Sequence, residues 1–172
     1  MDYRPFCSTE IVFTNRKGMQ QLLFSLDAVN LILVMSESSA IRWNMTSFIE
    51  QLKGKCESLG GVFIWIKTVK PNPTPRDIVQ ALYFIGNRKV DVIIALGGGS
   101  AIDLAKGISA FYDIEKNTEY TVKQITENIK QREYNNSKFV DIIAIPSTAG
   151  TGSEVTQWPT IWDENKNGKL SI

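Results

Sequence analysis

The sequence predicts an α/β fold in which helices cover both faces of a parallel sheet and a β-hairpin follows. Short apolar runs suited to buried strands alternate with stretches whose apolar residues recur at helical spacing, the pattern of right-handed βαβ units. Residues 90–106, VDVIIALGGGSAIDLAK, place a strand, a glycine turn and a helix in direct succession. Near the end of the sequence, Asn167 and Gly168 separate two apolar segments and suit a hairpin turn.

The chain begins with a predicted strand, helix and strand. Residues 9–14, TEIVFT, and residues 30–35, NLILVM, are rich in branched apolar side chains and predict strands, the second of them buried. Between them, residues 17–26 place methionine and leucine side chains on one side of a short helix.

A polar turn and a long helix are expected next. The serines of residues 36–39, SESS, are good helix-capping residues, and an amphipathic pattern continues over residues 40–59. Gly60 and Gly61 end this helix, because glycine readily adopts the conformation that follows a helix. Residues 62–66, VFIWI, predict the next strand.

The proline-rich segment 70–75, KPNPTP, forbids regular structure and leads into another helix. Thr74 is its expected N-cap, a proline occupies the first helical position, and Asp77 stands where a capping box needs an acceptor. This helix runs to about Ile85 and is closed by the glycine that follows.

The second half of the chain predicts a strand over residues 92–96, a helix after the glycine turn, and a further surface helix within the polar stretch 115–138. Another buried strand, residues 139–145, ends at a loop of small and hydroxyl residues, PSTAGTGSE. Residues 155–163 and 169–172 are expected to form the two strands of the hairpin.

Composition and charge indicate one globular domain spanning residues 1–172, since 43% of the residues are hydrophobic and 22% charged. The net charge of +1, without basic or acidic blocks, argues against nucleic acid or an anionic membrane as partner. We find neither a signal peptide nor a run that could span a bilayer, and therefore expect a cytoplasmic protein. Cys7 and Cys56 are far apart and are expected to be reduced. The sequence contains no histidine, which excludes His-dependent nucleophilic catalysis by these residues.

Four polar loops follow predicted strands: residues 36–39, 71–74, 97–100 and 147–153. Because the carboxyl ends of parallel strands share one edge of the sheet, these loops should meet in a binding site, as in Rossmann-like nucleotide-binding folds. The glycine turn can bring bare backbone N–H groups of a helix N-terminus close to a phosphate. It matches neither the G-x-G-x-x-G pattern nor the P-loop, so a tight strand-to-helix turn without a ligand is the alternative.

Side chains in these loops offer hydroxyl groups rather than catalytic pairs. Asp103, one turn into the helix, either complements the helix dipole or bonds a ribose or substrate hydroxyl. Residues 147–153 suit hydrogen bonding to a base or phosphate, with a flexible surface loop as the alternative. No carboxylates are paired at a spacing that indicates acid–base catalysis, so the residues alone predict a nucleotide-binding domain without visible catalytic residues.

Three separated motifs carry a resemblance. ALGGGSAIDLAK, PNPTPRDI, and IPSTAGTGSEVT followed by WDENKNGKLSI resemble the iron-containing, or group III, alcohol dehydrogenase family over essentially the whole chain. The resemblance implies an N-terminal α/β domain that holds NAD(P) and a C-terminal all-helical domain that holds Fe²⁺ or Zn²⁺. It implies an oxidoreductase that interconverts a small alcohol and an aldehyde by hydride transfer.

The resemblance also implies which residues hold the cofactor. Gly98, Gly99 and Ser100 would cradle the pyrophosphate, with Asp103 beside the cofactor near the domain cleft. The remaining residues would contact the adenine side, line the cofactor groove or reach a ribose: Asn72, Ser147, Thr148, Thr151, Thr156 and Lys169.

One departure from the family concerns the choice of cofactor. Many NAD-using members carry an aspartate after the strand that matches residues 31–35, whereas this chain has Ser36, followed by Glu37 and Ser38. A hydroxyl in place of the carboxylate removes repulsion of a 2′-phosphate, and Arg42 could pair with one, which favours NADP(H) over NAD(H). The alternative is that Ser38 or Ser39 only caps the helix and Glu37 bonds the ribose hydroxyls.

The other departure concerns the metal. The family's ligands, an aspartate and three histidines, lie in the helical domain, whereas this sequence ends at Ile172 and has no histidine. We therefore expect the cofactor-binding half of an oxidoreductase, without metal or catalytic residues of its own and inactive in isolation. The alternatives are a non-catalytic nucleotide-binding fragment or degenerate paralogue, or a relative of dehydroquinate synthase or glycerol-1-phosphate dehydrogenase, against which the PSTAGTGSE loop argues.

Two finer expectations follow. The SESSAIR turn resembles that of phosphonoacetaldehyde-reductase-like members. An apolar face should remain exposed where the helical domain would pack, so self-association into a homo-oligomer is expected.

Overall fold

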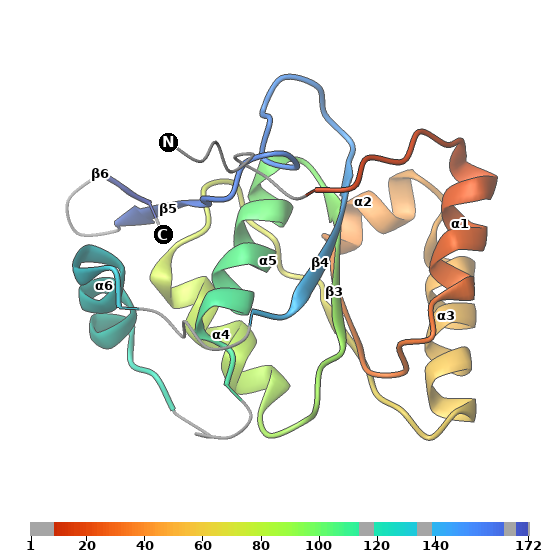
Figure 1. The fold of residues 1–172 in the computed structure, drawn as a ribbon, viewed down its shortest axis with the longest axis horizontal. Helices are drawn as coiled ribbons and strands as arrows, with labels where there is room; N and C mark the ends of the chain where they lie inside the picture. The colour runs from red at the N-terminus through yellow and green to blue at the C-terminus, as the bar shows by residue number, and fades with distance from the viewer. Residues whose placement is uncertain (1–8, 114–118, 134–138, 164–167, 172) are drawn as a thin grey trace, which may run out of the picture.

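The computed structural model describes residues 9–113, 119–133, 139–163 and 168–171, and it confirms the predicted fold class (Figure 1). Its four-stranded parallel sheet has the order β2-β1-β3-β4, where β1 is Leu31–Val34, β2 Phe63–Ile66, β3 Val92–Gly97 and β4 Asp141–Pro146. A separate antiparallel hairpin consists of β5 (Thr160–Asp163) and β6 (Gly168–Ser171).

Helices cover both faces of the sheet (Figure 1). On one face lie α1 (Arg16–Ser25), α2 (Glu37–Arg42) and α3 (Thr46–Ser58). On the other lie α4 (Pro75–Ile85) and α5 (Gly99–Phe111), while α6 (Val122–Gln131) packs outside α4, next to the hairpin. This arrangement gives the three layers expected of alternating strands and helices.

Two apolar cores result, one on each side of the sheet. Successive residues of a strand point to opposite faces, so Ile32 and Ile93 pack with α4 and α5, whereas Leu31 and Ile94 pack with α1 and α3. All four residues of β1 are buried because this strand has a neighbour on each side and helices on each face.

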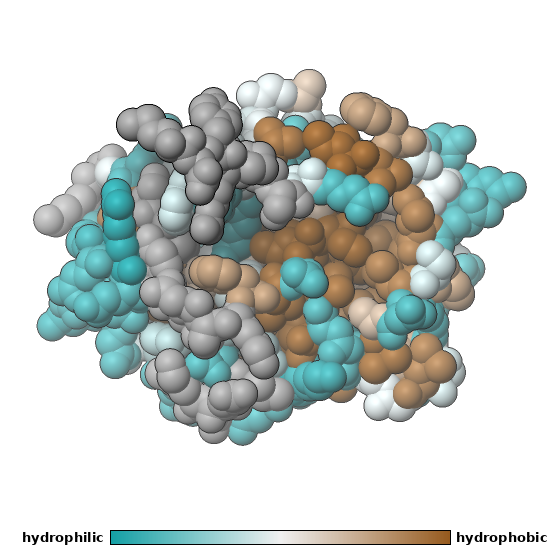
Figure 2. All heavy atoms as spheres, in the orientation of Figure 1, coloured by the Kyte–Doolittle hydropathy of each residue, from teal (hydrophilic) through white to brown (hydrophobic). Residues whose placement is uncertain are grey.

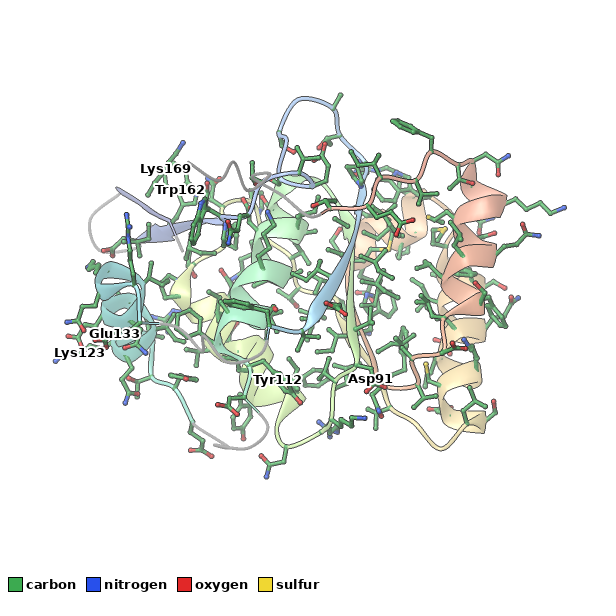
Figure 3. The ribbon with its side chains drawn as sticks, in the orientation of Figure 1. Asp91, Tyr112, Lys123, Glu133, Trp162 and Lys169 are labelled. Atoms are coloured by element: carbon green, nitrogen blue, oxygen red, sulfur yellow. The ribbon has the colours of Figure 1, made fainter. Side chains whose placement is uncertain are left out.

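Asp91 connects the amino ends of β1 and β3 through hydrogen bonds (Figure 3). Its carboxylate accepts hydrogen bonds from the backbone N–H of Asn30 at 2.9 Å, from the Asn30 side chain at 2.9 Å and from the backbone N–H of Val29 at 3.2 Å. Lys89 lies 3.1 Å away. Burial by itself raises the pKa of Asp91, but these hydrogen bonds outweigh it and hold the pKa below its ordinary value of 3.8.

The predicted capping box of α4 is confirmed. The Asp77 carboxylate accepts from the backbone N–H of Thr74 at 2.9 Å, and the Thr74 hydroxyl accepts from the backbone N–H of Asp77. Gly86, with φ of 57°, ends the helix as expected. The helix predicted within residues 115–138 is confirmed as α6, with Ile125 and Ile129 buried.

Residues 9–14 do not form the strand predicted for them. No described strand pairs with this segment, and its apolar side chains are exposed, with Phe13 at 95%. Branched residues favour a strand only where a neighbouring strand and a buried face are supplied.

Two other boundaries differ from the prediction. Residues 40–59 form α2 and α3 rather than one helix, because the chain turns at Asn44, whose φ of 50° is a conformation that asparagine tolerates. The hairpin strand predicted from residue 155 begins at Thr160, because the preceding segment stays in the loop. The turn residue Asn167 and the thiol of Cys7 lie outside the described residues.

An apolar area lies over the face on which β4 is nearest the viewer (Figure 2). β4 is an edge strand whose isoleucines are only half-buried, and exposed apolar residues elsewhere include Ile11, Phe13 and Phe139. This agrees with an exposed apolar face, while self-association stays a prediction. Among the described residues, no helix has the length and apolar character needed to cross a membrane.

Candidate functional site

The point at which the strand order reverses lies between β1 and β3. From β1 the chain crosses to β2 on one side of the sheet, whereas β3 and β4 follow on the other side. The loops after β1 and β3 therefore diverge, and a crevice forms at the carboxyl ends of these strands. A hollow of about 200 Å³ occurs here, lined by residues from the loops after three strands: Ser36, Ser39, Val69, Lys70, Pro71, Leu96, Gly97, Gly98, Ser100 and Ala101.

The N-terminus of α5 opens into this hollow without a side-chain cap. Its N-cap is Gly98, and no side chain accepts a hydrogen bond from its first turn. By contrast, Asn15 caps α1 and Thr74 caps α4. The uncapped amides and the helix dipole make this end of α5 suited to an anion. The hydroxyl of Ser100 accepts a hydrogen bond from the backbone N–H of Asn72 at 3.2 Å, joining the glycine turn to the loop after β2.

The loop after β4, residues 147–156, is rich in hydroxyl side chains and packs directly on the glycine turn, residues 97–100. The backbone N–H of Ser147 donates to the carbonyl of Gly97 at 2.9 Å. A Cβ atom at Gly98 would lie 3.1 Å from the Thr148 hydroxyl, and one at Gly99 would lie 3.0 Å from the Ser153 hydroxyl. A side chain at either glycine would press on this loop, while the hollow adjoins the other side of the turn.

Asp103 is bonded within the protein. Half-burial raises its pKa, although a hydrogen bond from the backbone of Thr160, the charge of Lys106 and a hydrogen bond from Ser153 each act to lower it. The carboxylate therefore faces the start of β5 and the hydroxyl-rich loop. This is a role that neither sequence-based interpretation of Asp103 included.

Comparison with known proteins identifies the family of the chain. The sequence model of the iron-containing alcohol dehydrogenases matches residues 9–172. The chain belongs to the iron-containing alcohol dehydrogenase family. This confirms the resemblance that the three motifs carry.

Similar proteins place the chain within the family. It is 32% identical, over 148 residues, to the NADPH-dependent butanol dehydrogenase of Clostridium saccharobutylicum, covering 86% of this chain and 36% of that enzyme. Its fold matches sulfoacetaldehyde reductase from Bifidobacterium kashiwanohense, crystallised with NAD⁺ (TM-score 0.75, 22% identity, 96% of this chain and 41% of that one). It also matches a mutant of an archaeal halo-thermophilic alcohol dehydrogenase from a Red Sea brine pool (TM-score 0.75, 25% identity, 100% and 43%). The chain thus spans about two fifths of these relatives' length or less.

In this family member, the serine-rich turn after β1, residues 36–39, forms the N-terminal cap of α2. The Ser36 hydroxyl accepts from the backbone N–H of Ser39 at 3.2 Å, donates to the Ser39 hydroxyl at 2.8 Å and lies 3.3 Å from that of Ser38. The cap is therefore Ser36 rather than Ser38 or Ser39. Of these three, Ser36 and Ser39 line the hollow. Glu37 is paired with Lys67 at 3.4 Å.

The other residues implied by the family divide between the hollow and its surroundings. Asn72, at a φ of 57°, reaches Ser100 beside the hollow, and Thr156 lies on the outer part of the hydroxyl-rich loop. Lys169 lies on β6 with its ammonium group 5.5 Å from the centre of the Trp162 ring (Figure 3), outside the hollow's lining.

Lys106 is a site-adjacent residue that the sequence interpretation missed. Its ammonium group donates to the backbone carbonyls of Ser153 and Thr156 and, at 3.1 Å, to the Thr156 hydroxyl. Its spacing could have indicated this role, because Lys106 follows Asp103 by three residues and so lies on the same face of α5.

The described residues do not fit the family's metal. They contain no group of three histidine, cysteine, aspartate or glutamate side chains that could hold an ion, and the sequence has no histidine.

Proposed function

We propose that residues 1–172 form a domain that holds NAD(P) in an oxidoreductase interconverting an alcohol and an aldehyde. The observation that carries the proposal is the uncapped N-terminus of α5, which opens from the glycine turn into a hollow at the strand-order reversal. Amide groups at such a helix terminus complement the charge of a pyrophosphate. Membership of the iron-containing alcohol dehydrogenases supports the reaction class.

The residues around the hollow fit a dinucleotide. Gly98, Gly99 and Ser100 would hold the pyrophosphate through backbone amides and one hydroxyl. Asn72 would lie at the rim, where it already contacts Ser100. The hydroxyl-rich loop would supply Ser147, Thr148, Thr151 and Thr156 for the adenine side and the groove.

The chain's own part in the reaction would be binding and orientation. When bound, the nicotinamide ring supplies or accepts the hydride. The described residues would hold the dinucleotide and exclude water from its pyrophosphate. Because they offer neither a metal site nor a pair of acid–base side chains placed at the hollow, we expect this chain by itself to bind NAD(P) without turning over an alcohol.

We further propose that NADP(H) is preferred. Ser36, Ser39 and Lys70 line the hollow, and none of the described residues that line it carries a carboxylate, although the Lys70 ammonium group lies 3.6 Å from the Asp77 carboxylate. The carboxylate of Glu37 is paired with Lys67, which reduces its ability to take the ribose hydroxyls. A 2′-phosphate would meet hydroxyls and positive charge here. The butanol dehydrogenase relative is NADPH-dependent, which agrees with this preference.

Three parts of the interpretation stay predictions. Arg42, in the last turn of α2, would approach the 2′-phosphate. Lys169 would need to reach the ribose from the hairpin. The likeness to phosphonoacetaldehyde-reductase-like members suggests an aldehyde substrate with an anionic group.

Titration calorimetry with NADPH and NADH tests the proposal. We expect saturable binding of both, tighter for NADPH. Gly98→Val should weaken both by tenfold or more, about 1.4 kcal/mol, because its side chain would press on Thr148 and shift the backbone amides of the glycine turn. Gly54→Ala on α3, where an added Cβ meets nothing within 4 Å, is the matched control. A folded sample that binds neither nucleotide would refute the proposal.

A further inference from the structure

Lys106 joins α5 to the far end of the hydroxyl-rich loop. Its half-buried side chain extends from the second turn of the helix, and its ammonium group contacts the Ser153 carbonyl at 2.6 Å together with the carbonyl and hydroxyl of Thr156. An ammonium group has three hydrogens to donate, which matches these three acceptors. Hydrogen bonds from a charged donor are about twice as strong as those between neutral groups.

The near end of the same loop is held by the sheet. The backbone N–H of Ser147 donates to Gly97 at 2.9 Å, immediately after β4 ends. The loop is thus fixed at its start by β3 and at its far end by α5, the two elements that flank the glycine turn.

Between these two attachments the loop rests on the glycines. Thr148 faces Gly98, and Thr151 faces Gly99, with a Cβ at Gly99 lying 3.2 Å from that of Thr151. Gly150 takes a φ of 95°, and an added Cβ there would meet nothing within 4 Å. The loop thus packs on the turn through Thr148 and Thr151, while Gly150 between them is open.

We propose that Lys106 is a positioning residue that sets dinucleotide affinity by holding the hydroxyl-rich loop against the glycine turn before the cofactor binds. The inference rests on the proposed dinucleotide site. A loop already in its bound conformation loses little entropy on binding, whereas a loose loop must be ordered at that moment. Lys106 would act through Ser153 and Thr156, without touching the cofactor.

Lys106→Met tests this role, because methionine has similar length and flexibility but no donor or charge. Dissociation constants for NADPH and NADH are measured by calorimetry, and hydrogen exchange of residues 147–156 is followed by mass spectrometry. Lys106→Arg keeps charge and donors, and Thr156→Val removes one of the three acceptors. Lys123→Met on α6, whose side chain is 84% exposed, is the matched control.

We expect Lys106→Met to raise both dissociation constants about tenfold and to speed exchange in residues 147–156, with exchange in β1 and β3 unchanged. Thr156→Val should show the same changes to a smaller extent, and Lys106→Arg should restore slow exchange and most of the affinity. If Lys106→Met does not fold, the exchange of residues 147–156 in nucleotide-free Thr156→Val decides in its place, because loss of a direct contact between Thr156 and the cofactor would leave that exchange unchanged.

Two results would overturn the inference: wild-type affinity in Lys106→Met, or weakened binding with exchange of residues 147–156 unchanged. If wild-type protein binds neither nucleotide while Lys106→Met still loosens the loop, the proposed cofactor site fails and the anchoring by Lys106 stands. The exchange measurement thus separates the two failures.

Discussion

Replacing Ser36 by aspartate should reverse the preference for NADPH. Ser36 lines the hollow and caps α2 through its hydroxyl, which accepts from the backbone N–H of Ser39. Aspartate caps helices as well as serine does, so Ser36→Asp should leave α2 intact. The change therefore adds one negative charge at the proposed ribose end of the hollow with little structural disturbance.

The expected loss of NADPH affinity in Ser36→Asp depends on how far the new charge is exposed to solvent. Two unit charges 4 Å apart interact by about 1 kcal/mol in water and about 4 kcal/mol near a protein surface. Ser36 is half-buried beside an open hollow, so we take about 2 kcal/mol, or roughly a 30-fold loss of NADPH affinity. Lys70 offsets only part of the repulsion because its ammonium group lies 3.6 Å from the Asp77 carboxylate, and the loss should shrink as salt is raised.

The assay is the ratio of the NADPH and NADH dissociation constants for wild type, Ser36→Asp and Ser36→Asn. Asparagine has the shape of aspartate and is an equally good cap, but it is neutral. The ratio should rise about 30-fold for the aspartate variant and change little for the asparagine variant. An unchanged ratio in Ser36→Asp, or an equal change in both variants, would refute the placement of the 2′-phosphate.

Three further predictions concern stability. In urea unfolding, Gly61→Ala should lower the free energy of unfolding by about 3 kcal/mol, because its Cβ would lie 2.2 Å from the Val29 carbonyl oxygen. Gly54→Ala, within α3, should raise it by about 1 kcal/mol. Equal changes in the two variants would contradict the close contact between Gly61 and Val29. Thr74→Ala should lose about 1 kcal/mol with its capping box, and an unchanged midpoint would count against that cap. Because the folded pKa of Asp91 lies below its ordinary 3.8, its carboxylate stabilises above that pH and the gain disappears as pH falls through the folded pKa. Asp91→Asn should therefore lower stability at pH 7 and flatten the fall below about pH 4, as measured by unfolding across pH.

Local signals in the sequence were sufficient for most of the fold. Thr74 and Asp77 form a cap from neighbouring residues alone, so the helix start at Pro75 could be predicted. The segment 9–14 failed because its branched side chains have no described strand to pair with, a condition that pattern cannot show. The break at Asn44 depends on one backbone angle within an otherwise continuous amphipathic pattern.

The site was predictable to the level of loops but not of contacts. The convergence of the loops that hold Ser36, Pro71 and Gly98 follows from parallel topology, and the structure confirms it. Thr160 and Ser153, which act on the pKa of Asp103, lie some fifty positions away in the sequence, so their proximity depends on tertiary packing. The sequence interpretation therefore left Asp103 available to a ligand and overlooked its lysine neighbour on α5.

Because no side chain caps the first turn of α5, binding of a ligand in the hollow should change the free energy of unfolding of the domain. α5 packs on β1, β3, β4, α4 and β5, so this helix is central to the apolar core on its side of the sheet. An anion that accepts from the amides after Gly98 would complete the helix as a side-chain cap completes α4. A nucleotide at a hundred times its dissociation constant would then raise the unfolding free energy by about 2.7 kcal/mol. A bound anion would then contribute to the stability of this domain in the way that a capping side chain contributes to the stability of a helix.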